Sequence, residues 1–97
     1  MRLLRRDILE ECSRNHAEVR KQLAAWRGYV ERSHWKEPTE VIESRSNVEN
    51  LGNNRFKFDI KGNKYRIVVR VDFDREVVEI RFADTHDNYN KIDALTV

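Results

Sequence analysis

The chain has 97 residues, of which 37% are charged and 39% hydrophobic, and its formal net charge at pH 7 is +2. This length predicts one small domain over residues 1–97, and the composition excludes a disordered chain. No apolar run approaches the roughly 20 residues of a membrane span, the first residues lack a signal peptide's apolar stretch, and the single cysteine, Cys12, excludes an internal disulfide. We therefore expect a cytoplasmic protein with no membrane partner.

The N-terminal third predicts two helices. Residues 1–4 fit either a short strand or the lead into a helix, and residues 5–14 place their apolar side chains on one helical face. Asn15 followed by Glu18 fits a capping box at the start of a second helix over about residues 16–33. The apolar stripe of that helix is interpreted as core and consists of Val19, Leu23, Trp26 and Val30.

The C-terminal half predicts an antiparallel meander. Pro38 fits the first turn of a short helix that runs through about Ser44, and residues 45–54 are predicted to be loop. The apolar period then changes to two, over three strands with turns at Gly62-Asn63 and Asp74-Arg75. The predicted fold class is α+β, with two N-terminal helices packed on the meander and a short helical turn near the C-terminus.

Basic residues follow one face of the predicted sheet. If both turns are two-residue hairpins, Asp59 faces Arg66, Lys57 and Arg81 flank Val68, and Glu79 faces Arg70, while Arg55 faces Arg70 from the other side. One interpretation is a set of surface salt bridges, each worth under about 1 kcal/mol. The other is a cationic cradle for phosphate, since arginine holds two phosphate oxygens with its planar fork.

The segment after the third strand combines His86, Tyr89 and Lys91. Histidine is the natural proton shuttle near neutral pH, and a helical turn would place His86 and Tyr89 on the same side. A structural role is the alternative for any lone histidine, but nearby Arg66 and Arg81 favour a catalytic site. No glycine-rich phosphate loop or metal-ligand motif is present, so we expect no metal and no cofactor.

Two segments of the chain resemble the signature blocks of HigB-type mRNA interferase toxins. They are Phe58–Ile67 and Ile80–Asp93, and Ala25-Trp26 with Trp35-Lys36 match weaker positions. The resemblance implies the RelE-like α+β fold and a toxin of a type II toxin–antitoxin system that cuts mRNA on translating ribosomes. It also implies a HigA-like helix-turn-helix antitoxin as partner, with the toxin acting as a monomer or held in a toxin–antitoxin hetero-oligomer.

The same resemblance implies a role for each candidate residue. The RNA 2′-hydroxyl would attack the adjacent phosphate, with Arg66 and Arg81 stabilising the developing charge. His86 would be the general acid or base, and Tyr89 would stack on a base or assist proton transfer. The remaining basic residues would hold the RNA backbone: Lys57, Lys64, Arg70 and Lys91.

Two residues depart from the family pattern beside His86. Asp84 stands where a glycine is expected, and Asn90 where an aspartate is common, which raises the alternative of a weakened toxin. Two other functions also stay open at this point. One is a non-catalytic module that binds RNA or the ribosome, and the other is a toxin of the same superfamily that targets a protein such as gyrase.

Overall fold

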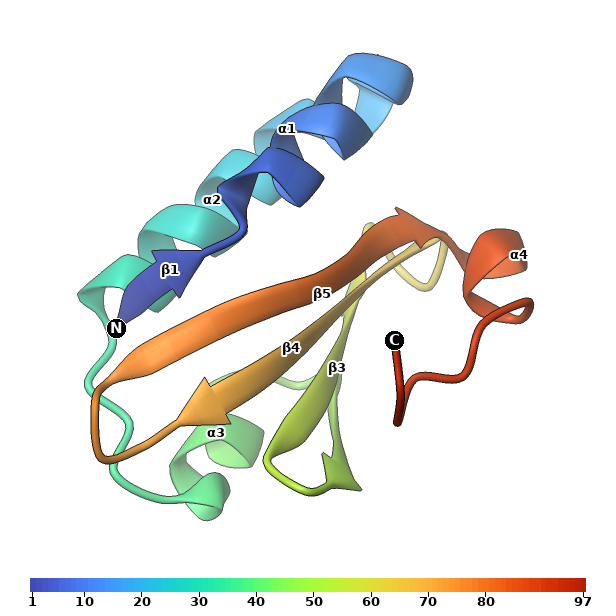
Figure 1. The fold of residues 1–97 in the computed structure, drawn as a ribbon. Helices are drawn as coiled ribbons and strands as arrows, with labels where there is room; N and C mark the ends of the chain where they lie inside the picture. Colours follow the sequence, from blue (N-terminus) through green and yellow to red (C-terminus); the bar gives the residue numbers. More distant parts are fainter.

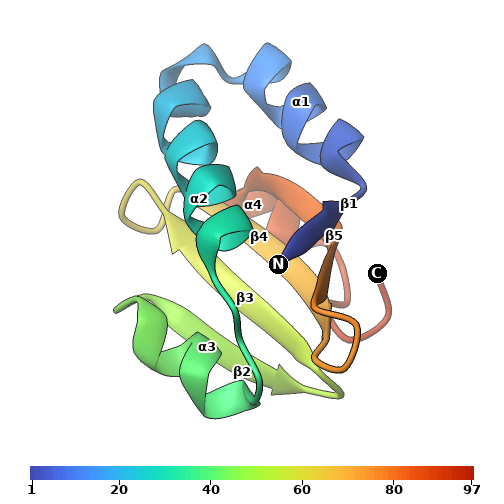
Figure 2. The same ribbon diagram turned by 90° about the vertical axis from the view of Figure 1, so that its left-hand side faces the viewer.

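The computed structural model describes all of residues 1–97 as an α+β fold in which helices and a C-terminal segment lie on opposite sides of one sheet (Figure 1, Figure 2). Helices α1 and α2 cover one side, whereas α4 and the residues after it lie on the other. No helix is long and apolar enough to cross a membrane. The elements in chain order are β1 (Arg2–Leu4), α1 (Arg6–Asn15), a 3₁₀ turn (Ala17–Val19), α2 (Arg20–Arg32), α3 (Pro38–Ser44), β2 (Val48–Gly52), β3 (Arg55–Ile60), β4 (Tyr65–Asp72), β5 (Val77–Thr85) and α4 (His86–Tyr89).

The sheet is larger than the meander that the periodicity predicts. Its order is β1-β5-β4-β3-β2, so the predicted β3-β4-β5 meander is confirmed but gains a strand at each edge. The first residues form β1, which runs parallel to β5 and buries Leu3. The prediction of loop over 45–54 is wrong, because β2 pairs with β3 there. This edge strand has no buried residue, so alternation in the sequence does not reveal it.

The register between β3 and β4 is the predicted one. Asp59 pairs with Arg66, Lys57 with Val68, and Arg55 with Arg70. The turn spans residues 61–64 rather than two residues, but it leaves the same pairs opposite each other.

The register between β4 and β5 departs from the prediction halfway along. Arg70 faces Glu79 as expected, but a β-bulge then places Phe82, not Arg81, opposite Val68. The extra residue reverses which side chains face inward. Ala83 therefore joins the core, and Phe82, which strict alternation along the third predicted strand would place in the core, lies outside the core cluster.

The predicted start of the second helix is also wrong. Asn15 is the last residue of α1 and caps nothing, and α2 begins at Arg20 after a single 3₁₀ turn. The side chain of Glu18, which a capping box would turn back toward the helix start, instead accepts a hydrogen bond from the Tyr65 hydroxyl. A contact with β4 thus replaces the local cap.

The core lies between α2 and the sheet. All of Val19, Leu23, Trp26 and Val30 are buried, which confirms the apolar stripe. Trp26 meets Phe58 edge-to-face with ring centres 5.4 Å apart, and Trp35 stacks on the same ring at 6.4 Å. These aromatic contacts tie the helical layer to β3.

We expect Trp26→Ala to lower the free energy of unfolding by about 3–5 kcal/mol, because it leaves a large cavity beneath α2. Urea denaturation followed by circular dichroism measures this change. The matched control is Ala25→Ser, at the exposed neighbouring position, which should shift the value by less than about 0.5 kcal/mol. Equal effects of the two substitutions would contradict the assignment of Trp26 to the core.

Candidate active site

Lys57, Asp59 and Arg66 form a charged group on the outer face, which we define as the face of β3, β4 and β5 opposite α1 and α2. Asp59 Oδ1 lies 3.3 Å from Arg66 Nε and 3.4 Å from Lys57 Nζ. The three side chains are only 12–21% exposed, which is unusual for charged groups. Mutual pairing explains how they tolerate this burial.

The pair between Arg66 and Asp59 is close but poorly aligned. Arg66 Nε and Asp59 Oδ1 are both buried, and neither has a partner with hydrogen-bond geometry. The contact is therefore mainly electrostatic, and the guanidinium keeps N–H donors that form no hydrogen bond to a carboxylate. An anion that approached Arg66 would meet a charge held in place by its neighbour.

Tyr89 covers this charged group from α4. The Arg66 guanidinium carbon lies 4.9 Å from the centre of the Tyr89 ring, and Lys57 Nζ lies 6.0 Å from it. Phe82, which the bulge turns outward, meets the same ring edge-on at 6.0 Å. Burial, followed by the negative charge of Glu49, raises the pKa of Tyr89, while Arg66 opposes the rise. The phenol therefore stays neutral at physiological pH.

His86 is held beside Arg66 by the turn between β3 and β4. Its backbone N–H donates to the Lys64 carbonyl at 2.9 Å, and its Nδ1 lies 3.2 Å from the Asn63 carbonyl oxygen and 3.5 Å from Arg66 Nη2. The carbonyl oxygen only accepts and the guanidinium only donates, so the role of Nδ1 depends on the tautomer, and Nδ1 carries the hydrogen where it pairs with Asn63. The lone pair of the neutral ring is then on Nε2.

A threonine starts the short helix that carries both residues. Thr85 Oγ1 accepts a hydrogen bond from the Asn88 N–H at 3.2 Å, which is an N-cap for α4. The helix brings both His86 and Tyr89 into contact with Arg66, whereas the sequence predicts only that the two share one side of a helical turn. Arg66, His86, Tyr89 and Lys57 thus form one cluster, and a 400 Å³ hollow beside His86 is lined by Lys64 and Thr85 among others.

The other predicted site residues lie apart from this cluster. Arg81 pairs with Glu79 at 3.2 Å and donates from Nε to the Val97 backbone oxygen at 3.0 Å. Glu79 therefore pairs with Arg81, whereas the predicted register made Arg70 its expected partner. Three residues predicted to hold RNA have exposed side chains and no ion pair: Lys64, Arg70 and Lys91. Arg55, which the sequence places only in a basic stripe, contacts the same Val97 oxygen as Arg81.

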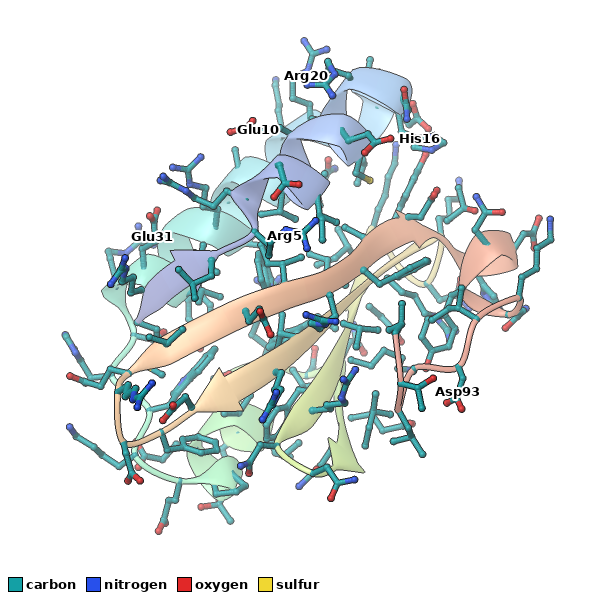
Figure 3. The ribbon with its side chains drawn as sticks, in the orientation of Figure 1. Arg5, Glu10, His16, Arg20, Glu31 and Asp93 are labelled. Atoms are coloured by element: carbon teal, nitrogen blue, oxygen red, sulfur yellow. The ribbon has the colours of Figure 1, made fainter.

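A second polar network holds the C-terminal end of β5, which leads directly into His86. Asp84 pairs with His16 Nε2 at 3.3 Å and accepts from the Thr85 N–H at 2.7 Å. Figure 3 shows His16 at the end of α1, on the side toward the end of β5. Asp84, the departure from the family pattern, thus links α1 to the segment that bears the cluster.

Tyr65 extends this network to β4. Its ring lies 5.2 Å from that of His16, and its hydroxyl donates to the Glu18 carboxylate. That hydrogen bond, with burial, raises the pKa of Tyr65 to about 12, and it lowers the pKa of Glu18. Burial and the charges of Asp84 and Glu18 raise the pKa of the Cys12 thiol to about 11, so Cys12 is not a thiolate nucleophile at neutral pH.

A family model for the RelE-like toxic component of a toxin–antitoxin system, the HigB toxin, matches residues 19–92. The chain belongs to the HigB toxin family. No curated protein matches it. The matched part of the toxin runs from the start of α2 to just beyond α4 and contains the whole cluster, whereas β1 and α1 precede it. Membership of this family makes the protein a toxin with an antitoxin as its partner.

We expect Tyr65→Phe to destabilise the toxin at pH 7, and the loss to shrink as the pH falls toward 3. The folded-state pKa of Glu18 is lowered, so the stability from this contact is present above the unfolded pKa of about 4.3 and disappears as Glu18 is protonated. Urea denaturation of both proteins at the two pH values measures the change.

Tyr29→Phe is the matched control for that prediction. The Tyr29 hydroxyl donates to the Ser44 carbonyl at 3.1 Å, and a carbonyl does not titrate. Its destabilisation should be the same at both pH values. A Tyr65→Phe effect that is equally independent of pH would show that the phenol does not interact with a charged Glu18.

Proposed function

We propose that this toxin is an endoribonuclease that cleaves mRNA on the ribosome without a metal ion, by attack of the RNA 2′-hydroxyl on the adjacent phosphate. The observation that carries the proposal is the cluster itself. The half-buried guanidinium of Arg66 contacts both the imidazole of His86 and the ring of Tyr89, a neutral phenol, on the outer face of the sheet. Together they supply charge stabilisation, a proton acceptor and a proton donor.

The first step is proton transfer from the 2′-hydroxyl to His86 Nε2. In the tautomer whose Nδ1–H donates to the Asn63 carbonyl, the lone pair of the neutral ring is on Nε2. The 2′-oxygen then bonds to phosphorus as the bond to the 5′-oxygen breaks. The products are a 2′,3′-cyclic phosphate and a 5′-hydroxyl, and the imidazolium loses its proton to solvent before the next turnover.

Tyr89 and Arg66 act on the other side of the same phosphate. The raised pKa of Tyr89 keeps its hydroxyl protonated, so that it can donate to the departing 5′-oxygen, and the phenolate takes up a proton from solvent before the next turnover. Arg66 stabilises the charge on the non-bridging oxygens, with Asp59 and the Tyr89 ring holding the guanidinium in place. Removing one such preorganised donor costs about 10²–10³ in rate.

Basic residues around the cluster hold the rest of the strand. Lys57 lies inside the cluster and Arg81 at the bulge of β5, and Lys64, Arg70 and Lys91 have exposed side chains. Exposed lysine and arginine contribute affinity for the phosphate backbone without reading sequence. The proposed partners are mRNA, the ribosome and a HigA-like helix-turn-helix antitoxin, all in the cytoplasm.

We expect wild-type toxin to produce discrete cuts in a reporter mRNA during cell-free translation, and Arg66→Ala and His86→Ala each to lower the cleavage rate by at least about 10². Primer extension maps and quantifies the cuts. The matched control is Arg75→Ala in the β4–β5 turn. The Arg75 side chain is 84% exposed and pairs only with Asp72, so its removal should leave cleavage unchanged. Inhibition of translation without cuts would refute the nuclease and point to a toxin that blocks the ribosome or a protein target.

Two substitutions of Tyr89 separate the functions of its ring and its hydroxyl. Tyr89→Phe keeps the contacts of the ring with Arg66 and Phe82, so RNA binding should stay unchanged while the single-turnover rate constant falls. Tyr89→Ala should weaken both. Fluorescence anisotropy measures binding and quenched-flow assays measure the rate constant. A Tyr89→Phe variant that cleaves at the wild-type rate would exclude the hydroxyl as proton donor.

A further inference from the structure

The last residues of the chain fold back over the outer face and bind two arginines. We call residues 93–97 the C-terminal tail. Arg55 Nη1 donates to the Ala94 backbone oxygen at 3.1 Å and to the Val97 backbone oxygen at 2.8 Å, and Arg81 Nε donates to the same Val97 oxygen at 3.0 Å. Figure 1 shows the tail on the side of the sheet away from α1 and α2, and Figure 3 labels Asp93 within it.

The tail is an ordered turn and not a loose end. The N–H groups of Thr96 and Val97 both donate to the Asp93 carbonyl, at 3.1 and 2.9 Å, and Leu95 N–H donates to Asp93 Oδ1 at 2.9 Å. This turn directs the Ala94 and Val97 oxygens toward the arginines. The two guanidinium groups come from β3 and β5, on either side of β4, and meet at one oxygen.

Convergence of two guanidinium groups on one oxygen is the geometry of an anion site. Arg55 forms no ion pair with an acidic side chain, and its neighbour across the strand is Arg70, a like charge. Arg81 has Glu79 as its only acidic partner. Of these three arginines only Arg81 contacts an acidic side chain, and the acceptors that Arg55 finds are main-chain oxygens of the tail.

This anion site is separate from the one at Arg66. Arg55 pairs with Arg70, four residues along β4 from Arg66. At about 3.4 Å per residue the backbone positions of Arg66 and Arg70 are about 14 Å apart, which exceeds the span of one phosphate group, and Arg81 lies between them at the bulge. A single extended RNA strand on the outer face would therefore place one phosphate at Arg66 and another near Arg55.

We propose that Arg55 and Arg81 form a second phosphate site for the RNA strand, and that the C-terminal tail occupies this site until RNA displaces it. The inference rests on the proposed function for the identity of the ligand. Arg55 is thus a binding residue that acts away from the chemistry. The tail is an internal competitor that weakens binding of any strand long enough to reach both sites.

A double-mutant cycle tests the competition by binding alone. The probe is a fluorescein-labelled oligonucleotide with 2′-O-methyl groups, which lacks the attacking hydroxyl and is not cleaved. Four proteins are compared: the full chain and a chain ending at Ile92, each with Arg55 or with Arg55→Ala. Circular dichroism melting confirms that each is folded, and Arg75→Ala in the full chain is the control for loss of one positive charge.

We expect removal of the tail to tighten probe binding on the order of tenfold, because the released arginine donors bind phosphate instead. In the shortened chain Arg55→Ala should reverse that gain, whereas in the full chain it should have a smaller effect. A shortened chain that binds no better than the full one, or a gain that survives Arg55→Ala, would overturn the proposal.

Hydrogen exchange gives a second test on the intact protein. The amides of Leu95, Thr96 and Val97 are bonded within the tail, so displacement by saturating probe should accelerate their exchange. Unchanged exchange with the probe bound would overturn the proposal even if the shortened chain failed to fold.

Cleavage of the unmodified oligonucleotide, measured in parallel, separates this inference from the proposed function. If tail removal tightens binding and Arg55→Ala reverses that gain, but no chain cleaves the oligonucleotide, the phosphate site is supported and the nuclease is refuted. If the oligonucleotide is cleaved but the effects of tail removal and of Arg55→Ala on binding are independent, the phosphate site is refuted and the nuclease proposal stands. Absence of binding by every chain would refute the phosphate site.

Discussion

The pleat of β4 is the constraint on which the rest of this structure depends. Tyr65, Ile67, Val69 and Val71 point into the core, and Arg66, Val68 and Arg70 point to the outer face. A shift of one residue would bury two arginines and expose the apolar set, so the core strongly specifies this register. The position of Arg66 between Asp59 and His86 is a consequence of hydrophobic burial on the opposite side of the strand.

The β-bulge in β5 shapes the candidate site on the outer face of the sheet. Without it, Phe82 would face the core and the outer face would present Arg81 opposite Val68. The extra residue instead sends Phe82 outward, where its ring supports Tyr89, and it lets Ala83 fill the core position. Bulges reorient side chains near the ends of strands, and here the effect is to seat α4 over Arg66.

Four cations of the outer face are held by groups of their own chain, whereas Arg70 forms no ion pair. Asp59 lies against Arg66 and Lys57, Glu79 against Arg81, and the tail against Arg55. Such contacts fix the positions of the cations before a ligand arrives, which reduces the reorganisation needed on binding. The contact between Arg66 and Asp59 is poorly aligned and Arg55 contacts only main-chain oxygens, so a phosphate can compete for both arginines.

Periodicity in the sequence determined the apolar stripe of α2, the meander, the β3–β4 register and the grouping of basic residues on one face, because each depends on the repeat of a single element. The candidate cluster of Arg66, His86 and Tyr89 followed from that register and from the family resemblance. The strands β1 and β2, the bulge, the Glu18 contact and the placement of Arg55 under the tail were decided by tertiary structure. These features join residues far apart in the chain, and their stability comes from backbone pairing and from contacts between elements, which leave no period in the sequence.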